Sequence, residues 1–251
     1  MRTGVESRVS FFRSASLVVL GFVAFSPGVL EADDLPPPFS ESNCARDLTR
    51  RVQAWADALG GFEADFEQVS HPVAFGGGPT PPPTRSKGHV FLARPGRMRW
   101  NYEEPVESQV ISDGRELWIY DPASKEVQHL EATRGFLDAA ALEFLMGEGR
   151  LAETFEVSVS RCEGDEVEIE LVPRADAGYE RLGLRVRPGT GEVVATTLVD
   201  LLGNRTQVRF EQAQSDRVPA ASHFRFEVPD GVEVIKMRSS PTSSTNPSPG
   251  S

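Results

Sequence analysis

Histidine is the side chain best suited to acid–base and metal chemistry near neutral pH, and the chain contains four histidines. His71, His89, His129 and His223 are scattered singly over predicted loops and strands. The chain also lacks a Gly-x-Ser-x-Gly turn, a His-Glu-x-x-His pair and a glycine loop for a phosphate. The acidic side chains fall mostly on the solvent side of alternating strands. The sequence therefore predicts neither an enzyme nor a bound metal or cofactor.

The other reactive side chains are two cysteines, Cys44 and Cys162. Their spacing fits no metal-binding motif. Disulfides persist in oxidising compartments, and the start of the chain indicates export to one. We therefore expect a disulfide between Cys44 and Cys162.

The first residues have the pattern of a secretory signal peptide. Three arginines precede an apolar run over residues 15–25, which is shorter than the ~20 residues that a bilayer crossing needs. Ala32 offers a cleavage site, so the predicted signal peptide covers residues 1–32. A lipoprotein signal would place a cysteine directly after the apolar run, and this chain has none there. We therefore expect the exported protein to be soluble.

Composition divides the rest of the chain into three parts. Residues 33–42 are expected to be a flexible segment and residues 239–251 a disordered Ser/Pro-rich tail, which leaves residues 43–238 as one folded domain. The formal net charge is −11, and it becomes −12 when the signal peptide removes three Arg and two Glu. So acidic a chain is a poor partner for nucleic acid or for anionic lipid surfaces.

The folded domain begins with one amphipathic helix and continues mainly as strands. Apolar side chains recur with helical spacing after a cap at Ser42 or Asn43, and Gly60-Gly61 ends the helix. The period then changes to two, which predicts a strand with one wet face. This first strand covers residues 62–67, and further strands are predicted over residues 87–93, 97–102, 108–112, 116–120, 126–130, 155–162, 166–172, 179–186, 192–200, 204–211 and 226–234. Short turns between them favour an antiparallel meander, so the pattern predicts a mainly β fold, a curved sheet or incomplete barrel.

The predicted strands 97–102 and 116–120 carry many large apolar side chains, and a second predicted helix, Phe136 to Met146, is apolar nearly all round. A curved sheet closed by helices could enclose a cavity for a lipid. An ordinary packed core would have the same composition. A lipid hydrolase is a third interpretation, but it would need a Ser or Asp beside a His in the cavity.

Four segments together carry a resemblance to a known family. The stretch Ala93 to Trp100 (ARPGRMRW), then Glu104-Pro105, Val110 to Gly114 (VISDG) and Leu117 to Pro122 (LWIYDP), resembles the periplasmic outer-membrane lipoprotein carrier family, LolA. The resemblance extends from the first helix to the final strands. It implies an unclosed antiparallel β-barrel of about eleven strands, with a lid of short α-helices over an apolar cavity.

The resemblance also implies a function and partners. Members are periplasmic chaperones without enzymatic activity that take acylated lipoproteins from an inner-membrane ABC exporter to an outer-membrane receptor, with the acyl chains inside the barrel. We expect the same of this chain, as a monomer. A related carrier or sensor for another lipid or amphiphile is the alternative.

The family pattern assigns roles to individual residues. Arg94 matches an arginine that bonds backbone carbonyls of the lid and keeps the empty carrier closed, and Met98 matches a large apolar side chain at the rim. Leu48, Val52, Trp100, Leu117, Ile119, Phe136, Leu142, Phe144 and Leu145 are the other candidates for the cavity and lid. The Pro/Gly-rich loop over residues 71–86, the cysteines and the C-terminal tail depart from the family pattern.

Overall fold

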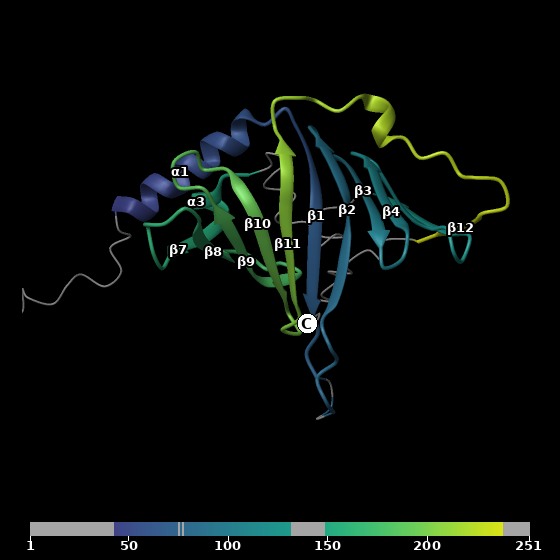
Figure 1. Cartoon of the computed structure of the whole chain (residues 1–251), viewed down its shortest axis with the longest axis horizontal. Helices are drawn as coiled ribbons and strands as arrows, with labels where there is room; N and C mark the ends of the chain where they lie inside the picture. The colour runs from purple at the N-terminus through teal and green to yellow at the C-terminus, as the bar shows by residue number, and fades with distance from the viewer. Residues whose placement is uncertain (1–42, 75, 77, 132–148, 238–251) are drawn as a thin grey trace, which may run out of the picture. The chain divides into compact units, whose positions relative to one another are not determined.

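The computed structural model describes residues 43–74, 76, 78–131 and 149–237 (Figure 1). The predicted signal peptide (1–32), the segment 33–42, the second helix (136–146) and the tail 239–251 lie outside the described residues.

Helix α1 (Asn43–Ala58) confirms the first predicted helix. Its buried side chains, Ala45, Leu48, Val52 and Ala56, recur every three or four residues and form one apolar stripe. The N–H of Leu59 bonds to the carbonyl of Ala56 at 3.1 Å, and the chain then leaves the helix. This helix can therefore bury a single face against the sheet.

The strands form one twelve-stranded sheet whose edge strands are not paired with each other, so the barrel is unclosed. The spatial order is β12-β6-β5-β4-β3-β2-β1-β11-β10-β9-β8-β7. The strands are β1 (Gly61–His71), β2 (Thr84–Ala93), β3 (Arg97–Glu104), β4 (Ser108–Asp113), β5 (Glu116–Asp121), β6 (Glu126–Glu131), β7 (Phe155–Val159), β8 (Val167–Pro173), β9 (Tyr179–Val186), β10 (Val193–Asp200), β11 (Arg205–Gln214) and β12 (Glu233–Lys236). This arrangement confirms the predicted mainly β, unclosed sheet.

Strand β1 lies at the centre of the sheet, between β2 and β11. Phe62, Ala64 and Phe66 are buried on its inner face, and the acidic residues between them point to the other face. Figure 1 shows α1 alongside the half of the sheet that contains β7 to β10. The core therefore lies between α1 and the inner face.

The strand predicted over residues 226–234 was wrong for most of its length. A turn occupies its centre, where the N–H of Val232 bonds to the carbonyl of Pro229 and Gly231 has a φ of 78°. Proline has no N–H for a strand ladder, and a positive φ suits glycine. Only Glu233–Lys236 remains as β12, and it pairs with β6 in parallel, whereas the other pairs are antiparallel.

Two short helices complete the described part of the chain. Helix α3 (Leu151–Thr154) lies beside α1, where the side chain of Gln53 accepts a hydrogen bond from the N–H of Leu151 at 2.9 Å. The 3-10 helix η2 (Ala221–Phe224) lies against β3 and β4. None of the helices within residues 43–131 and 149–237, apart from the two undescribed positions 75 and 77, is long and apolar enough to cross a bilayer.

Candidate functional site

The structure gathers the described cavity candidates on the inner face of the sheet. Leu48, Val52, Met98, Trp100 and Leu117 belong to one continuous core cluster, and Ile119 packs against it. They come from α1, β3 and β5, which are separated in sequence. Phe136, Leu142, Phe144 and Leu145 lie outside the described residues. The face is therefore apolar from the helix to the fifth strand.

Aromatic rings line the middle of this face. Phe66 meets Trp100 and Tyr102 edge to face, with ring centroids 4.8 and 5.1 Å apart, and Phe62 meets Phe210 in the same way at 5.2 Å. The Tyr102 hydroxyl donates to the side chain of Gln68 at 3.1 Å. The inner face thus changes from apolar near α1 to polar toward the β1–β2 loop.

Arg94 joins the sheet to the helix. It stands in the turn between β2 and β3, and its guanidinium donates a hydrogen bond to the backbone carbonyl of Ala56 in the last turn of α1. Carbonyls at a helix C-terminus lack part of their intrahelical bonding and attract positive charge. This bond therefore links the end of α1 to the turn between β2 and β3.

Arg97 supports the turn that carries Arg94. Its guanidinium donates to the carbonyl of Arg94 at 2.6 Å and lies over the ring of Phe224, 5.3 Å from the centroid. Phe224 is only 1% exposed. Because β3 alternates its faces, Arg97 points away from the face that Met98 occupies. The segment around η2 on the outer face is thus in contact with the turn that reaches the helix.

Both arginines also leave a buried donor without a partner. Within the described residues, the Nε atoms of Arg94 and Arg97 make no hydrogen bond. A buried donor without a partner costs about 1–3 kcal/mol, which offsets part of what the guanidinium bonds contribute. The net free energy that the contact between Arg94 and α1 contributes to stability is therefore small.

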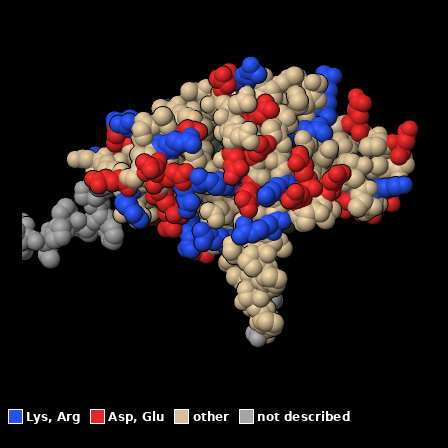
Figure 2. Space-filling model, viewed as in Figure 1, with Lys and Arg blue, Asp and Glu red and all other residues tan. Residues whose placement is uncertain are grey.

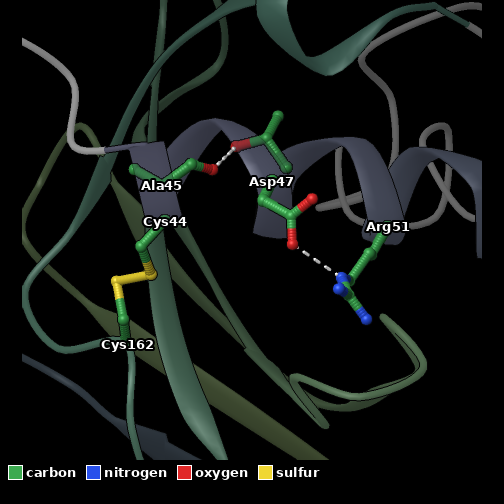
Figure 3. Close-up of a disulfide and its surroundings, with 6 residues drawn as sticks. Cys44, Ala45, Asp47, Arg51 and Cys162 are labelled. Carbon is green, nitrogen blue, oxygen red and sulfur yellow. Dashed lines mark hydrogen bonds and ion pairs between the residues drawn. A yellow bond between two sulfur atoms is a disulfide. The ribbon is translucent and has the colours of Figure 1, made fainter.

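The opposite end of α1 is held covalently. Cys44 in the first turn of the helix forms a disulfide with Cys162, with their Cα atoms 6.2 Å apart (Figure 3). A pocket of about 350 Å³ lies beside it. The residues that line it are Cys44, Asp47, Leu48, Arg51, Cys162, Pro188 and Gly189. Hydrogen bonds from Arg50 and then Arg51 lower the pKa of the Asp47 carboxyl.

The turn between β9 and β10 also approaches α1 closely. Gly191 has a φ of 78°, and a Cβ atom there would lie 2.4 Å from the backbone of Arg51. Arg51 in turn donates to the carbonyl of Gly189 at 3.1 Å. Helix α1 is thus held at its first turn by the disulfide, near its middle by the β9–β10 turn, and at its end by Arg94 and the buried Ala56.

Two of the histidines, His89 and His129, lie in side-chain contacts between neighbouring strands. His89 lies 2.8 Å from Asp65 and 3.2 Å from Glu63, and His129 lies 2.6 Å from Glu116. Within the part of the chain that the structure describes, no group of three or more His, Cys, Asp or Glu is arranged to hold a metal ion.

Sequence reasoning missed Arg97 and Gly191 as parts of the site. Arg97 carries no sign in the sequence of its contact with Phe224, which lies far along the chain. Gly191 stands in a turn segment, Pro188 to Gly191, where the glycine is expected for the turn alone. Its contact with α1 depends on the tertiary packing.

Comparison with known proteins places the chain among relatives. Residues 58–227 match the family model described as outer membrane lipoprotein carrier protein LolA. An outer-membrane lipoprotein carrier protein of Ralstonia nicotianae is 36% identical over 154 residues, which cover 60% of this chain and 69% of that protein. Another, of Chromohalobacter salexigens, is 29% identical over 187 residues, 74% of this chain and 85% of that one.

Solved structures with a similar arrangement are more distant in sequence. A LolA superfamily protein from Nitrosomonas europaea aligns with a TM-score of 0.41 at 13% identity, covering 72% of this chain and 97% of that one. The family model, in contrast, spans most of the described sheet together with the turn that carries Arg94. The chain belongs to the LolA family of outer membrane lipoprotein carrier proteins.

Proposed function

We propose that this protein is a monomeric periplasmic chaperone that holds the acyl chains of lipoproteins against the inner face of its sheet. It takes them after release by an inner-membrane ABC exporter and delivers them to an outer-membrane receptor. The observation that carries the proposal is the Arg94 guanidinium on the Ala56 carbonyl, which closes a helix over an apolar face. Membership of the carrier family supports the same function.

In this proposal, α1 is a lid with unequal ends. The disulfide and the close contact at Gly191 keep the helix in place from its first turn to its middle. Its C-terminal end is released when the hydrogen bond from Arg94 breaks. Leu48 and Val52 are lid residues, Met98 stands at the rim, and Trp100, Leu117 and Ile119 contact the acyl chains. Phe136, Leu142, Phe144 and Leu145 are proposed to add to the lid.

The energies favour a lid that opens for cargo. Burying acyl chains contributes ~0.8 kcal/mol per methylene, so a few methylenes exceed the ~1.5–3 kcal/mol of one hydrogen bond to a charged donor. Acyl chains of ordinary length can therefore displace the lid. The reaction needs no bond to be made or broken in the cargo, and we propose that the protein has no enzymatic activity.

The proposal can be tested by identifying the molecules that co-purify with the protein from the periplasm. Native mass spectrometry of the protein isolated gently from periplasm should detect acylated lipoproteins bound one to one. Free lipids or another amphiphile in their place would favour the alternative carrier or sensor. Turnover of a lipid ester by the purified protein would contradict the absence of enzymatic activity.

A further inference from the structure

The loop between β1 and β2 extends past the end of the sheet and carries no charge. From His71 to Thr84 the sequence has no Lys, Arg, Asp or Glu, and Figure 2 shows the protrusion in the colour of the other residues. Prolines at 79 and 81–83 restrict its backbone. A projecting, uncharged loop is unusual on a chain with a net charge of −11.

A second turn adds exposed apolar side chains at the same end. Leu201 and Leu202, between β10 and β11, are 68% and 62% exposed, and Val73 at the start of the loop is 36% exposed. The N–H of Val73 donates to the side-chain oxygen of Asn204 at 2.9 Å, so the loop and the turn are tied together. We call Val73, Leu201 and Leu202, with the described part of the loop, the apolar tip.

The turn that presents the two leucines is held by Asp200. Its carboxylate accepts from the N–H of Leu202 at 2.9 Å and from the N–H and side chain of Asn204 at 2.8 and 2.7 Å. Burial raises the pKa of Asp200, but these bonds outweigh it and keep the pKa below its ordinary value. The leucines therefore face solvent from a backbone that is fixed by hydrogen bonds.

Basic side chains stand where the tip leaves the sheet. In the strand register, Arg85 on β2 lies opposite Val69 and Arg205 on β11 lies opposite His71, both on the intervening strand β1. The Arg85 guanidinium donates to the Glu67 carboxylate at 2.9 Å, and Figure 2 shows basic side chains at the base of the protrusion. Guanidinium groups beside exposed leucines suit the phosphate region and the upper acyl region of a lipid layer. A groove on a protein partner would not require apolar side chains at the tip followed by basic side chains where the tip joins the sheet.

We propose that the apolar tip inserts into the interface of a zwitterionic lipid bilayer and docks the carrier on the membrane. This inference goes beyond cargo binding and does not depend on it, because the tip lies at the end of the sheet away from the contact between Arg94 and α1. The acidic body keeps the docking weak on anionic lipids.

Flotation with phosphatidylcholine vesicles tests the proposal on the purified, cargo-free protein. The wild-type chain should float with the vesicles, and the double variant Leu201→Ser with Leu202→Ser should bind at least about tenfold more weakly, since two exposed apolar side chains are lost. A matched control, Val172→Ser with Val228→Ser, removes two other exposed apolar side chains and should bind like the wild type.

Two results would overturn the proposal. One is a wild-type protein that does not float with the vesicles, and the other is a double variant that floats as well as the wild type. Thermal unfolding of both variants separates lost docking from lost folding, because the Asp200 bonds are made to backbone groups that serine retains. Binding of acylated lipoprotein by the double variant should remain unchanged, so docking and cargo binding can fail separately.

Discussion

Arg94→Leu removes the hydrogen bond between the β2–β3 turn and the end of α1. The bond to a charged donor contributes about 1.5–3 kcal/mol, and the positive charge at the helix C-terminus adds about 0.3–1 kcal/mol. The buried Nε without a partner subtracts about 1–3 kcal/mol. The net contribution of Arg94 to the closed lid is therefore about 1 kcal/mol, in addition to the burial of the apolar stripe of α1, and it is equivalent to about fivefold in an equilibrium constant.

If the lid must open before acyl chains bind and is closed in most molecules, the contribution of Arg94 reduces the affinity for acyl chains by the same factor. Titration of Arg94→Leu with a fluorescent fatty-acid analogue should therefore give a Kd about fivefold lower than that of the wild type. The rate of release should fall, because closure no longer competes with the bound chain. Arg94→Lys keeps a charged donor and should lie between the two.

Arg115→Leu is the matched control, since Arg115 is an exposed arginine in the β4–β5 turn. It should bind the analogue like the wild type. An unchanged or higher Kd in Arg94→Leu, with the fold intact by circular dichroism, would refute the role of Arg94 in closing the lid.

Three other predictions concern the parts that hold the helix and the tip. Replacing Cys44 and Cys162 by serine should lower the free energy of unfolding by about 5 kcal/mol in denaturant titrations, because the bridge closes a loop of 118 residues; an equal stability of both forms would contradict this. Gly191→Ala should destabilise the protein by about 2–4 kcal/mol, through a positive φ and a clash with α1, whereas Gly189→Ala, which has open space, should be nearly neutral in the same assay. Because the pKa of Asp200 is lowered on folding, its contribution to stability is present above its ordinary pKa and is lost as the pH falls below about 4; unfolding of Asp200→Asn should depend less on pH in this range, and identical pH profiles would refute the assignment.

Local patterns predicted the parts of the fold that depend on period and turn chemistry. The stripe of Leu48, Val52 and Ala56 gave α1, and the alternation from Phe62 to Phe66 gave β1. These patterns are visible because each element buries one face only. The arrangement of strands around a curved sheet followed from their short turns.

Contacts between distant segments were beyond the same reasoning. The parallel pairing of β12 with β6, and the ring of Phe224 beneath Arg97, join residues more than a hundred positions apart. The proposed role of Arg94 came from family resemblance, since a charged turn residue has no pattern of its own. The distance between Cys44 and Cys162 likewise depends on how α1 packs on the sheet.

The central claim is that the apolar inner face binds acyl chains of lipoproteins. Its most direct test is to mix the purified carrier with a triacylated lipoprotein that has been diluted out of detergent. A parallel sample contains the carrier and the same lipoprotein without its acyl chains. Size-exclusion chromatography should yield a one-to-one soluble complex with the acylated form alone. Equal binding of both forms, or aggregation of the acylated form beside an unoccupied carrier, would contradict the account.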